Sequence, residues 1–214
     1  MTDSPRTEAL AWWQEQIARE HYTGGRDELP SDAAERYLLT QQLLTPTPGS
    51  WGWVVTAPEQ QEGALRQNYW RLVELLLGIY TPAAIDRLSA IRLRMGDASI
   101  PPLLHVTHDA SSSERRMEVA PGLVVSLRPG RRGLMAEAID VDGLLLPVMN
   151  QARLLTTLTV TDIRDHRDLV LTWLQSLAIG QRELETAYEA DPRPVLLARI
   201  GHLAQKVGNR RLVE

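Results

Sequence analysis

Cysteine, lysine and long apolar runs are the three features that this chain lacks or nearly lacks. Cysteine is absent, which excludes disulfides, thiolate metal sites and cysteine nucleophiles and leaves the redox compartment open. Of the 23 basic residues only Lys206 is a lysine, which disfavours metal-dependent nucleases of the restriction-enzyme kind, since these place a lysine beside the metal-binding acid. No stretch approaches about 18 consecutive apolar residues, and the polar segment Met1–Arg6 carries no apolar core of a signal peptide. We therefore expect a cytoplasmic protein without membrane association.

Motifs that carry chemistry are also missing. The glycine-containing stretches that begin at Thr23 and Arg128 lack the spacing of a dinucleotide fingerprint and of a P-loop. No Gly-x-Ser-x-Gly elbow occurs, and the scattered aspartates fit turns and helix starts. The sequence therefore predicts no catalytic residue and no cofactor.

One cluster of side chains resembles a set of metal ligands: His105, His108 and Asp109. On a strand, residues three apart point to opposite faces, so the two imidazoles would not converge on one ion. We predict no metal site here. A small enzyme that uses these three residues is kept as an alternative.

Length and composition favour two domains of an α+β protein. The chain has 214 residues, of which 43% are hydrophobic and 23% charged, as in ordinary globular domains. Residues 57–63 are polar and rich in glutamine and glutamate, which is typical of a linker. We place the boundary near residue 60, with domains 1–60 and 61–214.

The first domain reads as two helices followed by a hairpin. Ser4-Pro5 predicts the start of a helix that runs to about Tyr22, where Gly24-Gly25 ends it. A second helix begins at Ser31-Asp32 and ends near Leu44, and a Pro/Gly turn within 45–50 joins two strands. This order is that of a winged helix, provided that a third short helix lies within 22–30.

The second domain reads as helices, then short strands, then helices. A strongly apolar helix begins at Leu65, and Thr81-Pro82 predicts the start of the next, with Gly96 at its end. The expected strands are 103–107, 117–119, 123–127, 134–140 and 144–148. The expected C-terminal helices are 150–159, 163–179, 181–190 and 193–208. We predict a mixed or antiparallel sheet domain that ends in a helical bundle.

Charge is unevenly distributed along the chain. Residues 1–70 carry 5 arginines and 10 acidic residues, whereas residues 71–136 carry 9 and 6. The middle third is therefore basic, and its arginines are candidates for one patch on the sheet: Arg92, Arg94, Arg115, Arg116, Arg128, Arg131 and Arg132. Such a patch either binds phosphates or an acidic partner, or is a solvated edge whose charges keep strands of different molecules apart.

The order of these blocks resembles a known family. The aromatic hairpin is followed by Tyr80-Thr-Pro-Ala-Ala-Ile-Asp-Arg-Leu-Ser-Ala-Ile and then by Leu104-His-Val-Thr-His. The segment Asp142-Gly-Leu-Leu-Leu-Pro-Val-Met-Asn-Gln-Ala-Arg and the closing segment 196–208 are similar to the same family. The chain thereby resembles the AbiEi-type antitoxins of type IV toxin–antitoxin systems.

The resemblance implies a non-enzymatic antitoxin that counteracts a nucleotidyltransferase-like toxin and represses its own operon through a winged-helix domain. The side chains that would read DNA from the second helix are Arg36, Tyr37, Gln41 and Gln42. The predicted wing has no basic residue, although DNA binding needs several contacts from Lys or Arg. The alternative is a protein-interaction module of a bacterial defence or toxin system that does not bind DNA.

Overall fold

A computed structural model of the chain describes residues 4–56, 63–109, 113–130, 134–190, 192 and 194–209. The chain forms two compact units. The first comprises Met1–Ile79 and Arg116–Val125, and the second Tyr80–Arg115 and Ser126–Glu214. Helices and a mixed sheet are both present, so the predicted α+β class is confirmed. The domain boundary predicted near residue 60 lies outside the described residues and stays a prediction.

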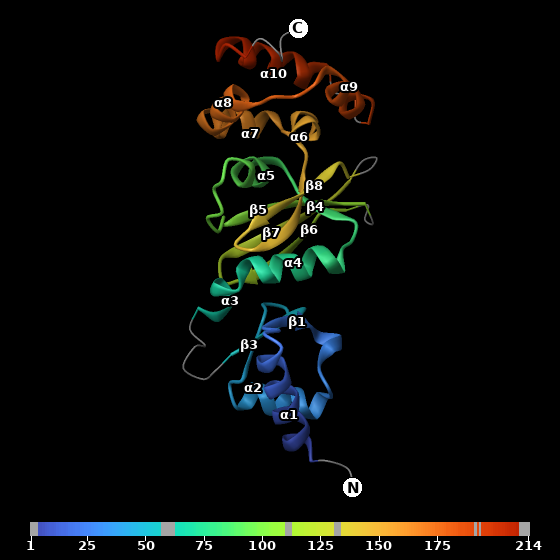
Figure 1. Cartoon of the computed structure of the whole chain (residues 1–214), viewed down its shortest axis with the longest axis vertical. Helices are drawn as coiled ribbons and strands as arrows, with labels where there is room; N and C mark the ends of the chain where they lie inside the picture. Colours follow the sequence, from blue (N-terminus) through green and yellow to red (C-terminus); the bar gives the residue numbers. More distant parts are fainter. Residues whose placement is uncertain are drawn as a thin grey trace. The chain divides into compact units, whose positions relative to one another are not determined.

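Within its described residues, the first unit contains helices α1 and α2, a small sheet, and helices α3 and α4 (Figure 1). Their bounds are α1 Pro5–Ala18, β1 Thr23–Gly25, the 3-10 turn η1 Arg26–Glu28, α2 Asp32–Thr40, β2 Leu44–Pro46, β3 Gly52–Val55, α3 Ala64–Gln67 and α4 Tyr69–Ile79. The three strands form an antiparallel sheet in the order β1-β3-β2. The predicted hairpin of β2 and β3 is confirmed, and α4 packs against β1.

The N-terminal helix starts where the sequence predicts and ends earlier. The Ser4 side chain caps α1 by accepting a hydrogen bond from the Thr7 amide, with Pro5 at the first helical position. The helix ends at Ala18, four residues before Tyr22, and Gly24 and Gly25 belong to strand β1. Gly24 is needed there because a Cβ at this position would overlap the Trp53 ring.

A compact apolar core joins these elements. Trp53 lies at its centre: its ring meets that of Trp12 edge-on with centroids 5.0 Å apart, and its Nε1 donates to the Gly25 carbonyl at 2.7 Å. The Ser31 hydroxyl caps α2 and donates to the Glu8 carboxylate of α1 at 2.9 Å. The buried members of this core are Ala9, Ala34, Leu38, Leu44, Trp53 and Val55.

The second sheet has six strands in the order β6-β7-β5-β4-β9-β8. It is mixed, because β4 pairs antiparallel with β5 and parallel with β9, while β8 and β9 are antiparallel. The strand bounds are β4 Ala83–Ile85, β5 Leu103–His108, β6 Arg115–Ala120, β7 Leu123–Pro129, β8 Ala136–Val141 and β9 Leu144–Met149. The expected strands 103–107, 117–119, 123–127 and 144–148 lie within these bounds, and 134–140 overlaps β8.

Strand β4 corrects the prediction that Thr81-Pro82 starts a helix. Residues Ala83–Ile85 are all buried and pair with β5 on one side and β9 on the other. Helix α5 begins only at Arg87, where the Asp86 carboxylate accepts from the Arg87 amide, and runs to Arg94. Gly96 follows its end with a φ of +81°, as predicted.

The C-terminal helices cover the second sheet through α5, which contacts β5, β8 and β9 as well as α6 and α8. In Figure 1, α5 and these helices lie on the same side of β4, β5 and β8. Their bounds are α6 Gln151–Thr157, α7 Val160–Asp165, α8 Arg167–Ser176, α9 Gln181–Ala190 and α10 Pro194–Lys206. The single helix expected over 163–179 is divided at His166. Within the described residues, no helix combines the length and apolarity that crossing a membrane requires.

Candidate functional site

The four side chains predicted to read DNA do not form one surface of α2. Arg36 is exposed, and its Nε donates to the Asp32 carbonyl at 3.1 Å. Tyr37 is half-buried and packs against the core around Trp53. Gln41 and Gln42 follow the helix, Gln41 as its C-cap and Gln42 with a φ of +59°. Of the four, Arg36 is the one that projects from the exposed side of the helix itself.

The turn between β2 and β3, the predicted wing, is held by contacts within the first unit. Thr47 and Gly52 bind one another across it, with Oγ1 accepting from the Gly52 amide at 3.0 Å. The Trp51 indole donates to the Glu118 carbonyl of β6 at 3.1 Å. No lysine or arginine occurs between Arg36 and Arg66, so the turn presents no cation to a phosphate.

Few cations are available on the N-terminal elements. Residues 4–56 contain four arginines. Arg19 pairs with Glu15 at 2.6 Å, and Arg26 lies 3.6 Å from Glu35. Within the described part of the chain, Arg6 and Arg36 have no ion pair.

The predicted basic patch is divided between the two ends of the second sheet. Arg94 joins α5 to the sheet: its side chain is 8% exposed, and it donates to the Met149 carbonyl at 2.7 Å and to Glu137 at 2.8 Å. These partners lie on β9 and β8. Arg92 lies nearby on α5 and is 4.0 Å from Asp97.

The other arginines of the patch lie at the opposite edge of the sheet. Arg115 and Arg116 are exposed on the edge strand β6, and Arg128 lies on the neighbouring strand β7, 3.5 Å from Glu114. Arg131 and Arg132 lie outside the described residues. The structure therefore brings Arg115, Arg116 and Arg128 to adjacent strands and separates them from Arg92 and Arg94.

The two histidines of β5 have different surroundings. His105 Nδ1 lies 3.4 Å from the Ser89 hydroxyl, and burial, with the nearby charge of Arg87, lowers the pKa of His105 to about 4. His108 is almost fully buried beside Tyr80, with ring centroids 5.5 Å apart, and burial lowers its pKa. Asp109 is exposed. Among the described residues, no group of three His, Cys, Asp or Glu side chains could hold a metal ion.

A buried polar network that the sequence did not suggest lies where β4 passes into α5. The Asp86 carboxylate accepts hydrogen bonds from the hydroxyls of Thr107 and Thr157, each at 2.7 Å. The next residue, Arg87, has a φ of +53° and turns its side chain to Asp162 of α7, with Nε 2.8 Å from Oδ2. The network thus fastens α7 to the start of α5.

The ion pair of Arg87 and Asp162 is deeply buried, with side chains 9% and 5% exposed. Burial alone would raise the pKa of Asp162, but hydrogen bonds from Arg87 and Thr159 outweigh it and hold this pKa below its usual value. Asp162 also caps α7 by accepting from the Thr159 amide at 2.8 Å. The carboxylate is therefore fully engaged in holding the fold.

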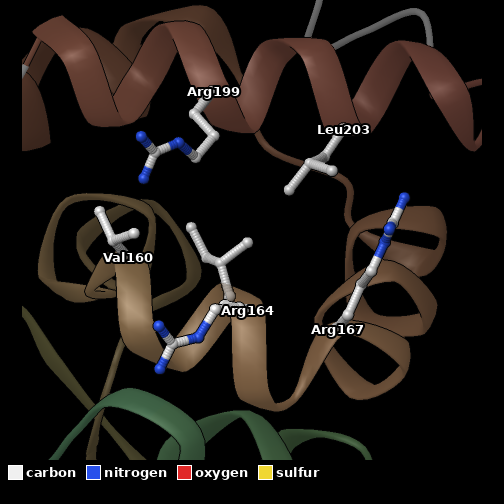
Figure 2. A pocket seen from close by; sticks show the side chains of 6 residues that line it. Val160, Arg164, Arg167, Arg199 and Leu203 are labelled. Atoms are coloured by element: carbon white, nitrogen blue, oxygen red, sulfur yellow. The ribbon is translucent and has the colours of Figure 1, made fainter.

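On α7, α8 and α10, six side chains line a cavity of about 360 Å³ (Figure 2). They are Val160, Ile163, Arg164, Arg167, Arg199 and Leu203. Val160, Ile163 and Arg164 share one side of α7 by their spacing of i, i+3 and i+4, and Arg167 lies at the start of α8, beyond the break at His166. Such a volume is within the range of ligand-binding pockets.

The cavity combines apolar and cationic walls. Ile163 and Leu203 are buried, whereas Val160 is 55% exposed. Arg164 binds Asp165 at 2.6 Å. In the described part of the chain Arg167 has no ion pair, and the Arg199 Nη1 atom is buried without a hydrogen-bond partner. Two guanidinium groups at this site are thus available to a ligand.

The sequence contained a partial signal for this site. The apolar and basic residues of 160–167 alternate at helical spacing, but Arg199 and Leu203 lie more than 30 residues further along the chain. No pattern in the sequence indicates that α10 packs near α7. Comparison with known proteins adds no assignment: no family model matches the chain, and no curated protein matches it.

Proposed function

We propose that the chain is a non-enzymatic, antitoxin-like regulator that counteracts a partner toxin and represses its own operon by binding DNA. The observation that carries the proposal is the order of elements in the first unit. Two helices precede a β2-β3 hairpin, and β3 pairs with β1 in an antiparallel sheet of order β1-β3-β2. The third short helix expected within 22–30 is replaced by strand β1 and the 3-10 turn Arg26–Glu28. Apart from this helix the order agrees with that of winged-helix domains, and it supports the resemblance of the sequence to AbiEi-type antitoxins.

In this proposal α2 enters the major groove and Arg36 contacts DNA from its exposed side. The proposed toxin is the nucleotidyltransferase-like protein that the resemblance implies. No catalytic role is assigned to His105 or Asp162, because the first lies against Ser89 and the second is bound by Arg87 and Thr159.

The charges predict weak, only slightly salt-dependent DNA binding. Each neutralised phosphate adds about −0.9 to the slope of log K against log salt concentration. With Arg6 and Arg36 as the arginines without an ion pair on the described N-terminal elements, the slope for one protomer is about −2.

The experiment is fluorescence anisotropy of labelled DNA from upstream of the gene, titrated with the full chain between 50 and 200 mM salt. Arg36→Ala should weaken binding and make the slope shallower by about 1. Arg19→Ala is the matched control, because Arg19 is exposed and paired with Glu15 on α1. An Arg36→Ala variant that binds like the wild type would contradict the proposed role of α2.

The second candidate is a protein-interaction module that does not bind DNA. The hydrogen bond from Trp51 to the Glu118 carbonyl favours it, because a wing fixed to β6 is not free to follow a DNA backbone. Absence of binding to the upstream DNA at 50 mM salt, together with retained binding of the toxin, would support this candidate over the first.

A further inference from the structure

We infer that the groove between α10 and the consecutive helices α7 and α8 docks a short acidic segment of a partner protein, with an apolar side chain set between two carboxylates. This inference rests on the proposed function insofar as that function requires a partner protein. It concerns a surface of the second unit that lies outside every site predicted from the sequence.

The groove has an apolar middle and a cation on each side. Figure 2 shows Arg199 and Leu203 extending from α10 towards α7, while Arg167 reaches from α8 towards α10. Leu203 and Ile163 form the buried base. An apolar side chain that enters between the guanidinium groups would be removed from water against this base.

The apolar surface continues along α10. Val195, Arg199 and Leu203 are spaced by four residues and therefore share one side of the helix. Val195 is 73% exposed, and Val160 on the facing helix is 55% exposed. From Val195 to Leu203 the helix rises about 12 Å, which matches about two turns of a docked helix.

The arginines that line the groove favour an acidic segment as its ligand. The nearest acids on α7 are already bound, Asp165 by Arg164 and Asp162 by Arg87. Arg167 and the buried Arg199 Nη1 atom keep unmet charge and hydrogen-bonding capacity within the described residues. Carboxylates match the planar donors of a guanidinium, so a segment with two acids and an apolar residue between them fits the groove.

The test is selection from a displayed library of random 15-residue peptides on the full-length protein, with counter-selection on an Arg167→Gln/Arg199→Gln variant. We expect enriched peptides with Asp or Glu on both sides of an aliphatic or aromatic residue. For a selected peptide, each single Arg→Gln change should weaken binding about tenfold, and doubling the salt concentration should weaken it further.

Arg182→Gln is the matched control, because Arg182 is an exposed arginine of α9 that does not line the cavity. It should change the affinity less than twofold, and all variants should keep the wild-type circular dichroism spectrum. The inference is overturned if no peptide is enriched, or if enriched peptides bind the double variant as tightly as the wild type. The selection contains neither DNA nor toxin, so its failure is distinct from failure of the proposed function.

Discussion

The buried ion pair of Arg87 and Asp162 gives the most definite prediction about the second unit. Changing Asp162 to Asn removes one charge while it keeps the shape of the side chain. Arg87 then keeps its charge in a site where its side chain is 9% exposed. Breaking a buried pair from one side costs about 3 to 5 kcal/mol, and since an amide still accepts one hydrogen bond, we expect a loss near the lower limit, about 3 kcal/mol.

The assay is urea unfolding followed at the indole resonance of Trp173. Five of the six tryptophans belong to the first unit, and Trp173 is buried in the second, so its signal reports on the second unit alone. Asp165→Asn is the control, because the pair of Arg164 and Asp165 is exposed, and it should leave the midpoint unchanged. A loss below about 1 kcal/mol for Asp162→Asn would show that the buried Arg87 does not depend on the charge of Asp162.

A double variant separates the lost charge pair from lost packing. Arg87→Met combined with Asp162→Asn leaves no buried charge and keeps an acceptor for the Thr159 amide, so it should recover most of the stability that Asp162→Asn alone loses. The pH dependence has a definite sign: since the folded pKa of Asp162 lies below its unfolded value, the stabilisation is full above about pH 4 and is lost as the pH falls through the folded pKa. Asp162→Asn should lack this acid-dependent loss.

Three further predictions concern single residues. The pKa of His105 is about 4 in the folded chain and about 6.5 in the unfolded chain, so the unfolded chain is protonated first and up to about 3 kcal/mol of stability is lost as the pH falls from about 6.5 to 4. His105→Gln should flatten this part of the curve of urea midpoint against pH, and an unchanged curve would contradict this prediction. In thermal unfolding, Gly24→Ala should destabilise the first unit by about 1 to 3 kcal/mol because the new Cβ overlaps Trp53. Gly78→Ala is the control on α4, where a Cβ meets open space, and it should stabilise the unit by about 0.5 to 1 kcal/mol. Equal effects of the two changes would argue against close packing of β1 and Trp53. Arg94→Met should lower the free energy of unfolding by about 1 to 3 kcal/mol without changing DNA affinity. Weaker DNA binding at unchanged stability would indicate that Arg94 belongs to a DNA-binding basic patch instead.

The sequence predicts the long elements of this fold well and the short strands poorly. The strands after Pro102 were visible because five runs of alternating residues are separated by turn signals. Strands β1 and β4 have three residues each, too few for any periodicity. Their neighbours also mislead: Gly24-Gly25 looks like a helix end, and Thr81-Pro82 looks like a helix start. Strand pairing in the tertiary structure decides the conformation of both segments: β1 pairs with β3, and β4 pairs with β5 and β9.

The candidate sites show the same limit. Arg94 looked like a member of a basic patch because its neighbours in the sequence are basic, but its carbonyl and carboxylate partners come from β9 and β8. The groove on α7, α8 and α10 was missed because its two walls are separated along the chain by more than 30 residues. Which helices pack together depends on contacts between residues far apart in the chain. The spacing of apolar and charged residues within one helix does not identify its neighbour.

The proposed function is that this chain counteracts a toxin encoded beside it. The direct measurement is growth of bacteria in which the product of the adjacent reading frame is induced with and without this chain. We expect growth arrest by the neighbouring product alone and recovery when the chain is present. Arrest that the chain does not relieve, or growth that is the same in both cultures, would contradict it.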